Sequence, residues 1–244
     1  MANLDSIARL AEIDGILLVD KPANISSHDV VKAVKQRFNL VKVGHGGTLD
    51  PNATGLLALL VGNGTRLSAD LMGSDRTYAA VLRLGRVTNT FDRDGETVSE
   101  HPFESVTREM FEKVVRKEFL GDVFQKPPAF SVVKMPAHAN YDIVRTAEEN
   151  ERTEHLVHIF RLDVTDFAPP LVSFSMSCTK GGQPRVLAHD IGQALGCGAS
   201  LESLQRVKCG RYAVDDAIGF MDLLKLDAPG FRSRVIPMSE VRTR

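Results

Sequence analysis

The segment LVSFSMSC, residues 171–178, decides the fold class because its apolar and polar residues alternate strictly. Val172, Phe174, Met176 and Cys178 alternate with Ser173, Ser175 and Ser177. This period of two is typical of a strand with one buried and one open face. Gly181 and Gly182 then break the pattern, and Pro184 suits the first position of a helix that runs to about Leu195. Strand and helix therefore follow each other within one compact stretch.

The same kinds of element recur along the chain without a regular βαβ repeat. Strands are predicted at 15–20, 77–85 and 155–164, a strand or short helix at 56–61, a turn at 62–64 and a helical turn at 141–147. Ser26 and Asp29 form a capping box that opens one helix. Thr107 caps a second, whose apolar face is predicted to hold Met110, Phe111, Val114, Val115 and Phe119. The pattern predicts one mixed α+β unit of one or two lobes.

The balance of charged residues disfavours a nucleic-acid binder that relies on an overall basic charge. The chain has 244 residues, with 30 basic and 31 acidic side chains, so it lacks the overall basic excess of many nucleic-acid binders. A local basic cluster remains at residues 28–45, where Lys32, Lys35, Arg37 and Lys42 face only Asp29. That cluster is either an RNA-binding surface or an ordinary solvated helix face.

Cysteine usage and the N-terminus indicate a cytoplasmic protein. The three cysteines are odd in number and widely spaced, which disfavours a disulfide framework and Cys-x-x-Cys motifs. The first 15 residues lack the long apolar run of a signal peptide, and no segment reaches the ~18 apolar residues of a membrane span.

Metal and nucleotide sites are not expected. His155 and His158 lie three residues apart on a predicted strand and therefore point to opposite faces. The polar loop NTFDRDGE, residues 89–96, begins like a calcium loop but lacks its later ligands, so a turn at Asp94-Gly95 is expected. The glycine-rich segments fit neither the P-loop nor the dinucleotide-binding pattern.

The loop GHGGTLDPNATG, residues 44–55, is the strongest functional candidate. Its glycines let the backbone approach a bulky ligand closely, and the Asp50-Pro51 step favours extended geometry at Asp50. Such a loop presents one carboxylate to a ligand. The alternative is an aspartate that satisfies the amides of a turn.

The order of several motifs resembles the TruB-type pseudouridine synthase family. The resemblance spans roughly residues 14–220 and is carried by GILLVDKPANISSHDVV, GHGGTLDPNATGLLALLVGNGTR, RTYAAVLRLGRVTNTFDRDGE, QKPPAFSVVK, YDIVR, SCTKGGQPRVLAHDIGQALG and LESLQRVKCGRY. It implies a mainly antiparallel central sheet flanked by helices, with a catalytic cleft across the sheet. The implied activity converts uridine to pseudouridine at position 55 in the T-loop of tRNA, without a metal or organic cofactor.

Individual roles follow from the resemblance, residue by residue. Asp50 takes the place of the catalytic aspartate, and Arg185 that of the active-site arginine, which is expected to hold the pKa of Asp50 down. Tyr78 matches the tyrosine that packs on the flipped base. His45, Lys21 and Leu204 match residues at or near the uridine, Leu204 as an apolar wall.

The chain also departs from the family pattern. Where the family usually reads Lys-Gly-Thr-Tyr-Ile-Arg, this chain has Lys180-Gly181-Gly182-Gln183-Pro184-Arg185. Gln183 therefore replaces a tyrosine near the uracil, and it can hydrogen-bond but cannot stack. A catalytic domain is expected at 1–220, followed by a short C-terminal helix and tail at 221–244 in place of a complete PUA domain. Modest, salt-sensitive tRNA binding is expected from a monomer, through the basic helix and the tail arginines.

Two other functions remain open. The chain could be a non-catalytic tRNA-binding or tRNA-folding protein on the same scaffold, with activity lost through the Gln183-Pro184 change. A glycosidase-like hydrolase that uses Asp50 is the third reading, although no second carboxylate stands in a comparable motif.

Overall fold

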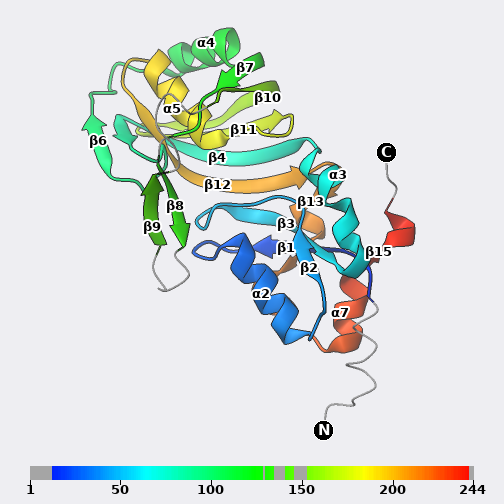
Figure 1. Cartoon of the computed structure of the whole chain (residues 1–244). Helices are drawn as coiled ribbons and strands as arrows, with labels where there is room; N and C mark the ends of the chain where they lie inside the picture. Colours follow the sequence, from blue (N-terminus) through cyan, green and yellow to red (C-terminus); the bar gives the residue numbers. More distant parts are fainter. Residues whose placement is uncertain (1–12, 129, 135–140, 146–152, 242–244) are drawn as a thin grey trace. The chain divides into compact units, whose positions relative to one another are not determined.

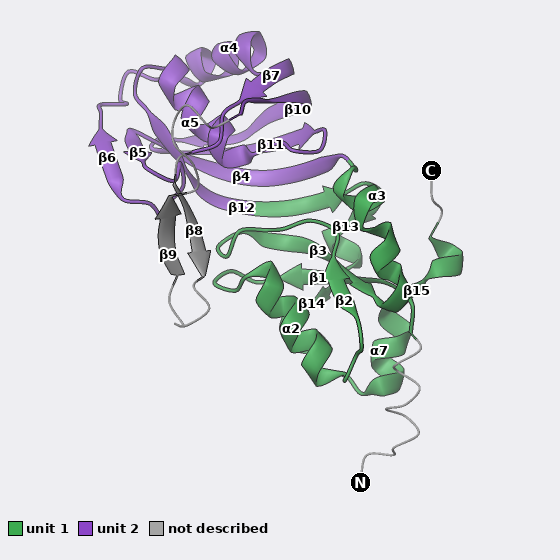
Figure 2. Cartoon of the chain, viewed as in Figure 1, with its two compact units in different colours: residues 1–74, 205–244 green, residues 75–204 purple. Residues whose placement is uncertain are grey.

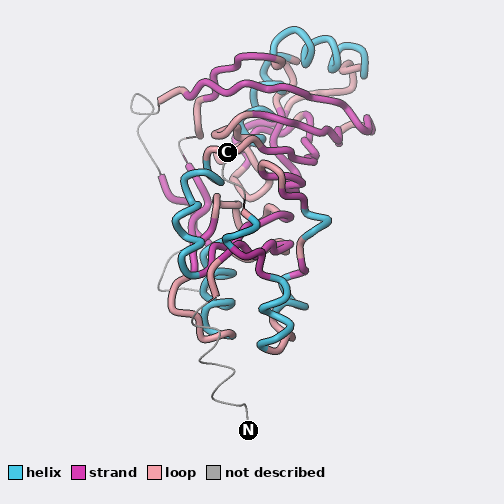
Figure 3. Tube along the Cα trace, turned by 90° about the vertical axis from the view of Figure 1, so that its right-hand side faces the viewer, coloured by secondary structure: helices cyan, strands magenta, loops and turns pink. Residues whose placement is uncertain are grey.

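The computed structural model describes residues 13–128, 130–134, 141–145 and 153–241. The chain divides into two compact units (Figure 2). The first unit joins both ends of the chain, Met1–Ser74 and Gln205–Arg244, and the second holds Asp75–Leu204. Both units combine strands with helices (Figures 1 and 3), which confirms the predicted α+β class. The functional boundary at residue 220 stays a prediction.

The first unit is built on a mixed sheet. Its central strand β1 (Gly15–Lys21) pairs antiparallel with β3 (Thr54–Val61) and β15 (Val235–Pro237), and parallel with β14 (Ile218–Gly219). Strand β3 also pairs with β2 (Val43–His45) and with the end of β12 (Ala199–Cys209), which in turn pairs with β13 (Tyr212–Ala213). The helices are α2 (Ser27–Arg37), η1 (Gly62–Leu67), α3 (Ser68–Met72), η3 (Val214–Asp216), α6 (Phe220–Leu223), α7 (Ala228–Arg234) and η4 (Met238–Glu240).

Helix α2 begins where the capping box predicted it. The Ser26 hydroxyl accepts a hydrogen bond from the Asp29 amide at 3.1 Å, which satisfies one of the unpaired N–H groups of the first turn. Val30 and Val34 are fully buried, and Lys32 and Lys35 are exposed on the other side. The helix is therefore anchored by one apolar stripe, as its 3.6-residue period indicates.

Arg37 and the tail arginines were expected to serve tRNA binding. Arg37 donates instead to the backbone carbonyls of Leu224 and Leu226 at 2.8 and 2.7 Å, so it ties α2 to the C-terminal segment. Arg232 and Arg234 lie in the exposed last turn of α7. Arg242 and Arg244 lie outside the described residues.

The second unit is built on an antiparallel sheet in the order β4–β11–β10–β7. These strands are Arg76–Leu84, Leu171–Cys178, His155–Ala168 and Gly121–Gln125. Two hairpins accompany them, β5 (Arg86–Thr88) with β6 (Thr97–Glu100) and β8 (Phe130–Lys134) with β9 (Tyr141–Arg145). The helices are α4 (Arg108–Glu118) and α5 (Pro184–Ala194).

The core of the second unit lies on one face of its sheet. Val172, Phe174, Met176 and Cys178 are at most 2 % exposed, which confirms the alternation of LVSFSMSC. They cluster with inward residues of β4 and β10 and with Phe111 of α4 and Leu187 of α5. Both helices therefore cover the same face of the sheet. Met110, predicted to share the apolar face of α4, is 46 % exposed.

Three local predictions changed or became definite. Residues 56–61 form a strand, because β1 and β2 supply hydrogen-bonding partners on both sides. The predicted turn at 62–64 continues as the 3₁₀ helix η1. The predicted helical turn at 141–147 is wrong over 141–145, where β9 pairs with β8 from Phe130↔Arg145 to Lys134↔Tyr141.

The three cysteines are buried free thiols, as their spacing predicts. Within the described ranges, no group of three or more His, Cys, Asp or Glu side chains could hold a metal ion. No helix in the same ranges is long and apolar enough to cross a membrane.

Candidate active site

Asp50 lies exposed on a loop whose backbone is fixed on both sides. Leu49 is 4 % exposed, and its amide and carbonyl both bond the Ser27 hydroxyl, at 2.8 and 3.0 Å. The Ala53 amide donates to the Asp50 carbonyl at 3.1 Å, which closes a turn. Gly47 has a φ of 145°, a region that favours glycine. Backbone contacts thus hold the loop next to Asp50, which is itself an exposed residue.

Lys21 supports this loop from below. Its side chain is fully buried, and its ammonium donates to the carbonyls of Pro22, Ile25 and Pro51 at 2.8–2.9 Å. Burial lowers the pKa of Lys21 to about 8, although the Asp50 charge acts in the opposite direction. The sequence predicted Lys21 as a substrate-binding residue. Its burial and its three carbonyl partners favour support of the Asp50 loop over direct contact with RNA.

Arg206 holds the other end of the loop. It is 3 % exposed, and its guanidinium donates to the carbonyls of Leu56, Thr48 and Gly47 at 2.8, 3.2 and 3.0 Å. A Cβ at Gly55, where φ is 95°, would lie 2.4 Å from the Arg206 carbonyl oxygen. The close approach of β3 to β12 therefore requires glycine and delivers the guanidinium beneath the loop.

His45 ends β2 at the start of the same loop. Its Nδ1 accepts a hydrogen bond from the Gly47 amide at 3.3 Å. Burial lowers the pKa of His45, and the Arg206 and His28 charges lower it further. The ring is therefore neutral at pH 7, with Nδ1 as acceptor and any ring proton on Nε2.

The second unit carries the other predicted residues. Tyr78 on β4 is 5 % exposed and belongs to the core cluster that α4 and α5 cover. Leu204 on β12 is half-buried and packs against the same cluster.

Gln183 precedes helix α5, and its backbone is held by Gln125 of β7. The Gln125 amide group accepts from the Gln183 N–H at 2.8 Å and donates to the Gln183 carbonyl at 3.2 Å. The Gln183 side-chain oxygen is enclosed and has no hydrogen-bond partner among the described residues. This pairing fixes the start of α5, on which Pro184 takes the first position as predicted.

Arg185 lies beside Asp92, a carboxylate that the sequence did not single out. Its Nη1 is 3.9 Å from Asp92 Oδ2, and both side chains are less than a fifth exposed. Burial raises the pKa of Asp92, while the Thr90 hydroxyl, 2.6 Å from Oδ1, and the Arg185 charge act in the opposite direction. Asp92 belongs to the NTFDRDGE loop, which the sequence predicted only as a turn. That local prediction gave no indication of its distant partner, Arg185.

Arg206 also escaped the sequence analysis, since its contacts reach carbonyls about 150 residues earlier in the chain. Arg206 lies within the motif LESLQRVKCGRY, where the sequence assigned it no role. Such contacts depend on how β3 and β12 pair, which no local pattern encodes.

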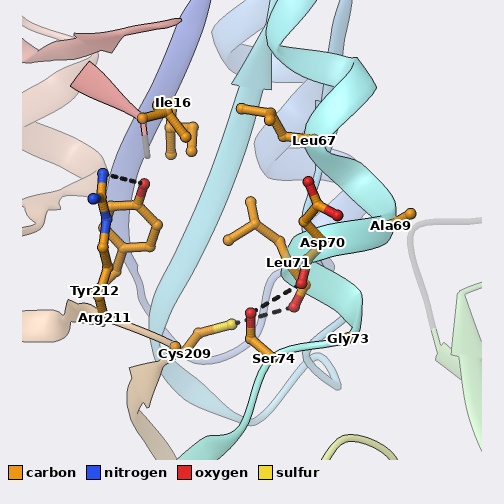
Figure 4. Close-up of a pocket in the computed structure, with 12 residues that line it drawn as sticks. Ile16, Leu67, Ala69, Asp70, Leu71, Gly73, Ser74, Cys209, Arg211 and Tyr212 are labelled. Atoms are coloured by element: carbon orange, nitrogen blue, oxygen red, sulfur yellow. Dashed lines mark hydrogen bonds between the residues drawn. The ribbon is translucent and has the colours of Figure 1, made fainter. Parts of the chain in front are cut away.

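A separate cavity of about 370 Å³ lies in the first unit and contains none of these residues (Figure 4). Its walls combine the apolar Ile16, Leu67 and Leu71 with Asp70. The Cys209 thiol in its wall donates to the Leu71 carbonyl at 3.7 Å.

Family models match nearly the whole described chain. The model of the TruB family pseudouridylate synthase N-terminal domain matches residues 35–183, and that of the tRNA pseudouridylate synthase B C-terminal domain matches residues 185–241. A tRNA pseudouridine synthase B of Opitutus terrae is 39 % identical over 227 residues, covering 93 % of this chain and 94 % of that protein. One from Cupriavidus pinatubonensis is 42 % identical, covering 94 % of this chain and 72 % of its own.

Solved structures show the same architecture. A crystal structure of a Cbf5-Nop10-Gar1 complex contains a chain that aligns with a TM-score of 0.73 and 27 % identity. The alignment covers 96 % of this chain and 63 % of that chain. An H/ACA RNP bound to a substrate RNA containing 2′-deoxyuridine aligns at 0.70 with 24 % identity, covers 96 % of this chain and 62 % of that one, and shows the fold alone. The motifs, the fold and the matched family models agree, and the chain belongs to the TruB family of pseudouridylate synthases.

Proposed function

We propose that this protein converts a uridine in the T-loop of tRNA to pseudouridine, with Asp50 as the catalytic carboxylate. The observation that carries the proposal is the fixed Asp50 loop, in a chain that belongs to the TruB family. The reaction breaks the N1–C1′ bond, turns the base and joins C5 to C1′. C5 loses its proton and N1 takes one up, so substrate and product are isomers.

The loop geometry supports this role for Asp50. Lys21 and Arg206 hold the backbone at Pro51, Gly47 and Thr48, while the carboxylate stays exposed to a ligand. Fixed positioning of a reacting group removes entropy that would otherwise add to the barrier.

The remaining residues have proposed roles in substrate recognition. Tyr78 packs on the flipped base, a contact that contributes roughly 1–3 kcal/mol for an aromatic side chain. Arg185 supplies positive charge for the reaction, and its partner Asp92 orients it. His45, Gln183 and Leu204 contact the uridine or the space it vacates.

Recognition of the T-arm, a monomeric state and a cytoplasmic location are parts of the same proposal. The free, buried cysteines support a reducing compartment. Light scattering of the protein with and without a T-arm hairpin tests the stoichiometry. A single protein per hairpin is expected, and a stable dimer would contradict the monomer.

The activity is tested with an unmodified tRNA transcript and a matched transcript in which the T-loop uridine is replaced by cytidine. Carbodiimide labelling followed by primer extension, which distinguishes pseudouridine from its isomer uridine, is expected to find one pseudouridine in the first and none in the second, with equal binding of both. Binding of both transcripts without product would favour the non-catalytic tRNA-binding protein instead.

A further inference from the structure

A stacked pair of rings joins the loop that carries Asp92 to helix α5. The rings of Phe91 and His189 lie 3.8 Å apart between centroids, with 10° between their planes. His189 follows Arg185 by four residues, so both side chains lie on one face of α5. Phe91 directly precedes Asp92. Two contacts, the ring stack and the Arg185–Asp92 ion pair, therefore connect the same loop to the same helix face.

The backbone at Phe91 adopts a conformation that aromatic residues avoid. Its φ is 64°, in the left-handed region where a bulky side chain is an outlier. The Phe91 amide donates to the Thr88 carbonyl at 3.2 Å, and the Phe91 carbonyl accepts from the Leu201 amide at 2.9 Å. Strained residues persist only where their surroundings hold them, and they concentrate at functional sites.

His189 contributes a ring and no charge. Burial lowers its pKa, so the imidazole is neutral at pH 7. Its Nδ1 is enclosed and has no hydrogen-bond partner among the described residues. A neutral imidazole contributes only its planar ring to the stack with Phe91, so an apolar ring of similar shape would stack as well.

The turn at Phe91 decides where the Asp92 carboxylate points. Oδ1 accepts hydrogen bonds from the Thr90 hydroxyl at 2.6 Å and the Asp94 amide at 3.1 Å. Oδ2 is left toward Arg185 at 3.9 Å, at the outer limit of an ion pair. A small rotation of the turn would therefore separate the two charges.

We propose that the Phe91–His189 stack sets the position of the Arg185–Asp92 ion pair, which makes His189 a positioning residue for pseudouridine formation. The inference rests on the proposed role of Arg185. It assigns a purpose to the strained backbone at Phe91 and to the stacked ring of His189.

Two substitutions of His189 test the stack. His189→Leu removes the stacking ring. The kcat is then expected to fall between about tenfold and a hundredfold, because Arg185 would be slightly misplaced. KM for tRNA should stay within about twofold, because Arg185 would still be present but displaced. His189→Phe keeps a stacking ring and is expected to recover most of the wild-type kcat. His158→Leu, on the exposed side of β10, is the matched control and should not change kcat.

Phe91→Gly provides a second, independent variant. Glycine accepts a φ of 64° without strain, so the chain is expected to fold with an unchanged or higher melting temperature. It lacks the ring, so kcat should fall as in His189→Leu. A loss of activity without a loss of stability separates positioning from a general structural role.

The outcomes are distinct. A wild-type kcat in both His189→Leu and Phe91→Gly would overturn the inference and leave the proposed function intact. Equal loss in His189→Phe and His189→Leu would also overturn it, because the imidazole itself would then be required. A wild-type protein that forms no pseudouridine would contradict the proposed function and, with it, the inference.

Discussion

At the scale of residues, the proposed chemistry depends on how the loop that carries Asp50 is held. Lys21 and Arg206 between them donate to six backbone carbonyls in and beside the Asp50 loop. Buried carbonyls need such donors, since leaving one unpaired costs about 1–3 kcal/mol. The two cations therefore stabilise the loop and determine its shape.

Arg206→Met should reduce both stability and turnover. Three carbonyls lose their donor, so the free energy of unfolding is expected to fall by about 3 kcal/mol or more. The kcat should fall at least about tenfold, because the Asp50 loop is no longer held in position. Urea unfolding and steady-state kinetics measure the two effects. Lys208→Met, at an exposed position on the same strand, is the control, and equal losses in both variants would contradict the role of Arg206.

The lowered pKa of Lys21 leads us to expect that kcat falls at alkaline pH. Below its pKa of about 8 the ammonium donates three hydrogen bonds, and above it one carbonyl loses its donor. We expect the kcat of the wild type to fall as pH rises through about 8. The Lys21→Met variant should have a lower kcat below pH 8 and should not show this fall, and a pH profile of kcat for both proteins measures the difference.

Stability should respond to the same titration in the opposite direction. The pKa of Lys21 is depressed from 10.5 in the folded state, so the folded protein binds fewer protons than the unfolded chain between about pH 8 and 10.5. The contribution of Lys21 to the free energy of unfolding therefore rises across that window. Urea titrations of the wild type and Lys21→Met give the difference, and a difference that falls with pH would contradict the assignment.

At the scale of elements, helix α5 depends on a partner outside itself. Pro184 at its first position has no N–H, and the preceding Gln183 makes no side-chain cap. Gln125 of β7 takes over by bonding both backbone groups of Gln183. The start of α5, and with it Arg185, is therefore positioned by the edge of the sheet.

Gln125→Leu tests this dependence. The substitution keeps the volume but leaves the Gln183 N–H without its acceptor, whereas the Gln183 carbonyl still accepts from the amides of Val186 and Leu187. A loss of about 1–3 kcal/mol in the free energy of unfolding is therefore expected. The kcat should fall with it, because Arg185 is two residues from the released backbone. Gln193→Leu, exposed near the end of the same helix, should leave both unchanged. Unchanged kinetics in Gln125→Leu would show that the helix start is held by other contacts.

Elements with strong local signals could be predicted from the sequence. The alternation of residues 171–178 and the capping box at Ser26 both depend on neighbours within a few positions, and both were confirmed. The segment 141–145 was mispredicted because its strand depends on pairing with β8, and its short mixed pattern fits either period. Of the candidate site, Asp50 and Arg185 were proposed from the motifs, and their roles stay predictions. Arg206 and Asp92 were not proposed, because their partners are distant in sequence. Arg206 contacts the carbonyls of Leu56, Thr48 and Gly47, and Asp92 contacts Arg185.

At the scale of the whole molecule, tRNA binding must work against a net charge of −1. Lys32 and Lys35 are exposed on α2 and are candidates for phosphate contacts, whereas Arg37 of the same helix is engaged with backbone carbonyls. Each lysine that contacts a phosphate adds roughly one unit to the salt dependence of binding.

Lys32→Ala with Lys35→Ala should therefore lower the slope of log K against log salt by about 2 in magnitude, as two phosphate contacts are lost. KM for tRNA should rise and kcat should not change, because α2 carries no proposed catalytic group. Filter binding from low to moderate salt gives the slope. Lys113→Ala with Lys117→Ala on α4 is the matched control, and an equal change in both double variants would assign the effect to net charge alone.

The most direct measurement is single-turnover conversion of the T-loop uridine by wild type and Asp50→Asn, with tRNA binding measured in parallel. Asparagine keeps the shape of the side chain but removes its charge and nucleophilicity. The wild type is expected to form one pseudouridine per tRNA, and Asp50→Asn to react at least about 1,000-fold more slowly while binding tRNA equally well. Comparable rates in the two proteins would contradict the catalytic role of Asp50.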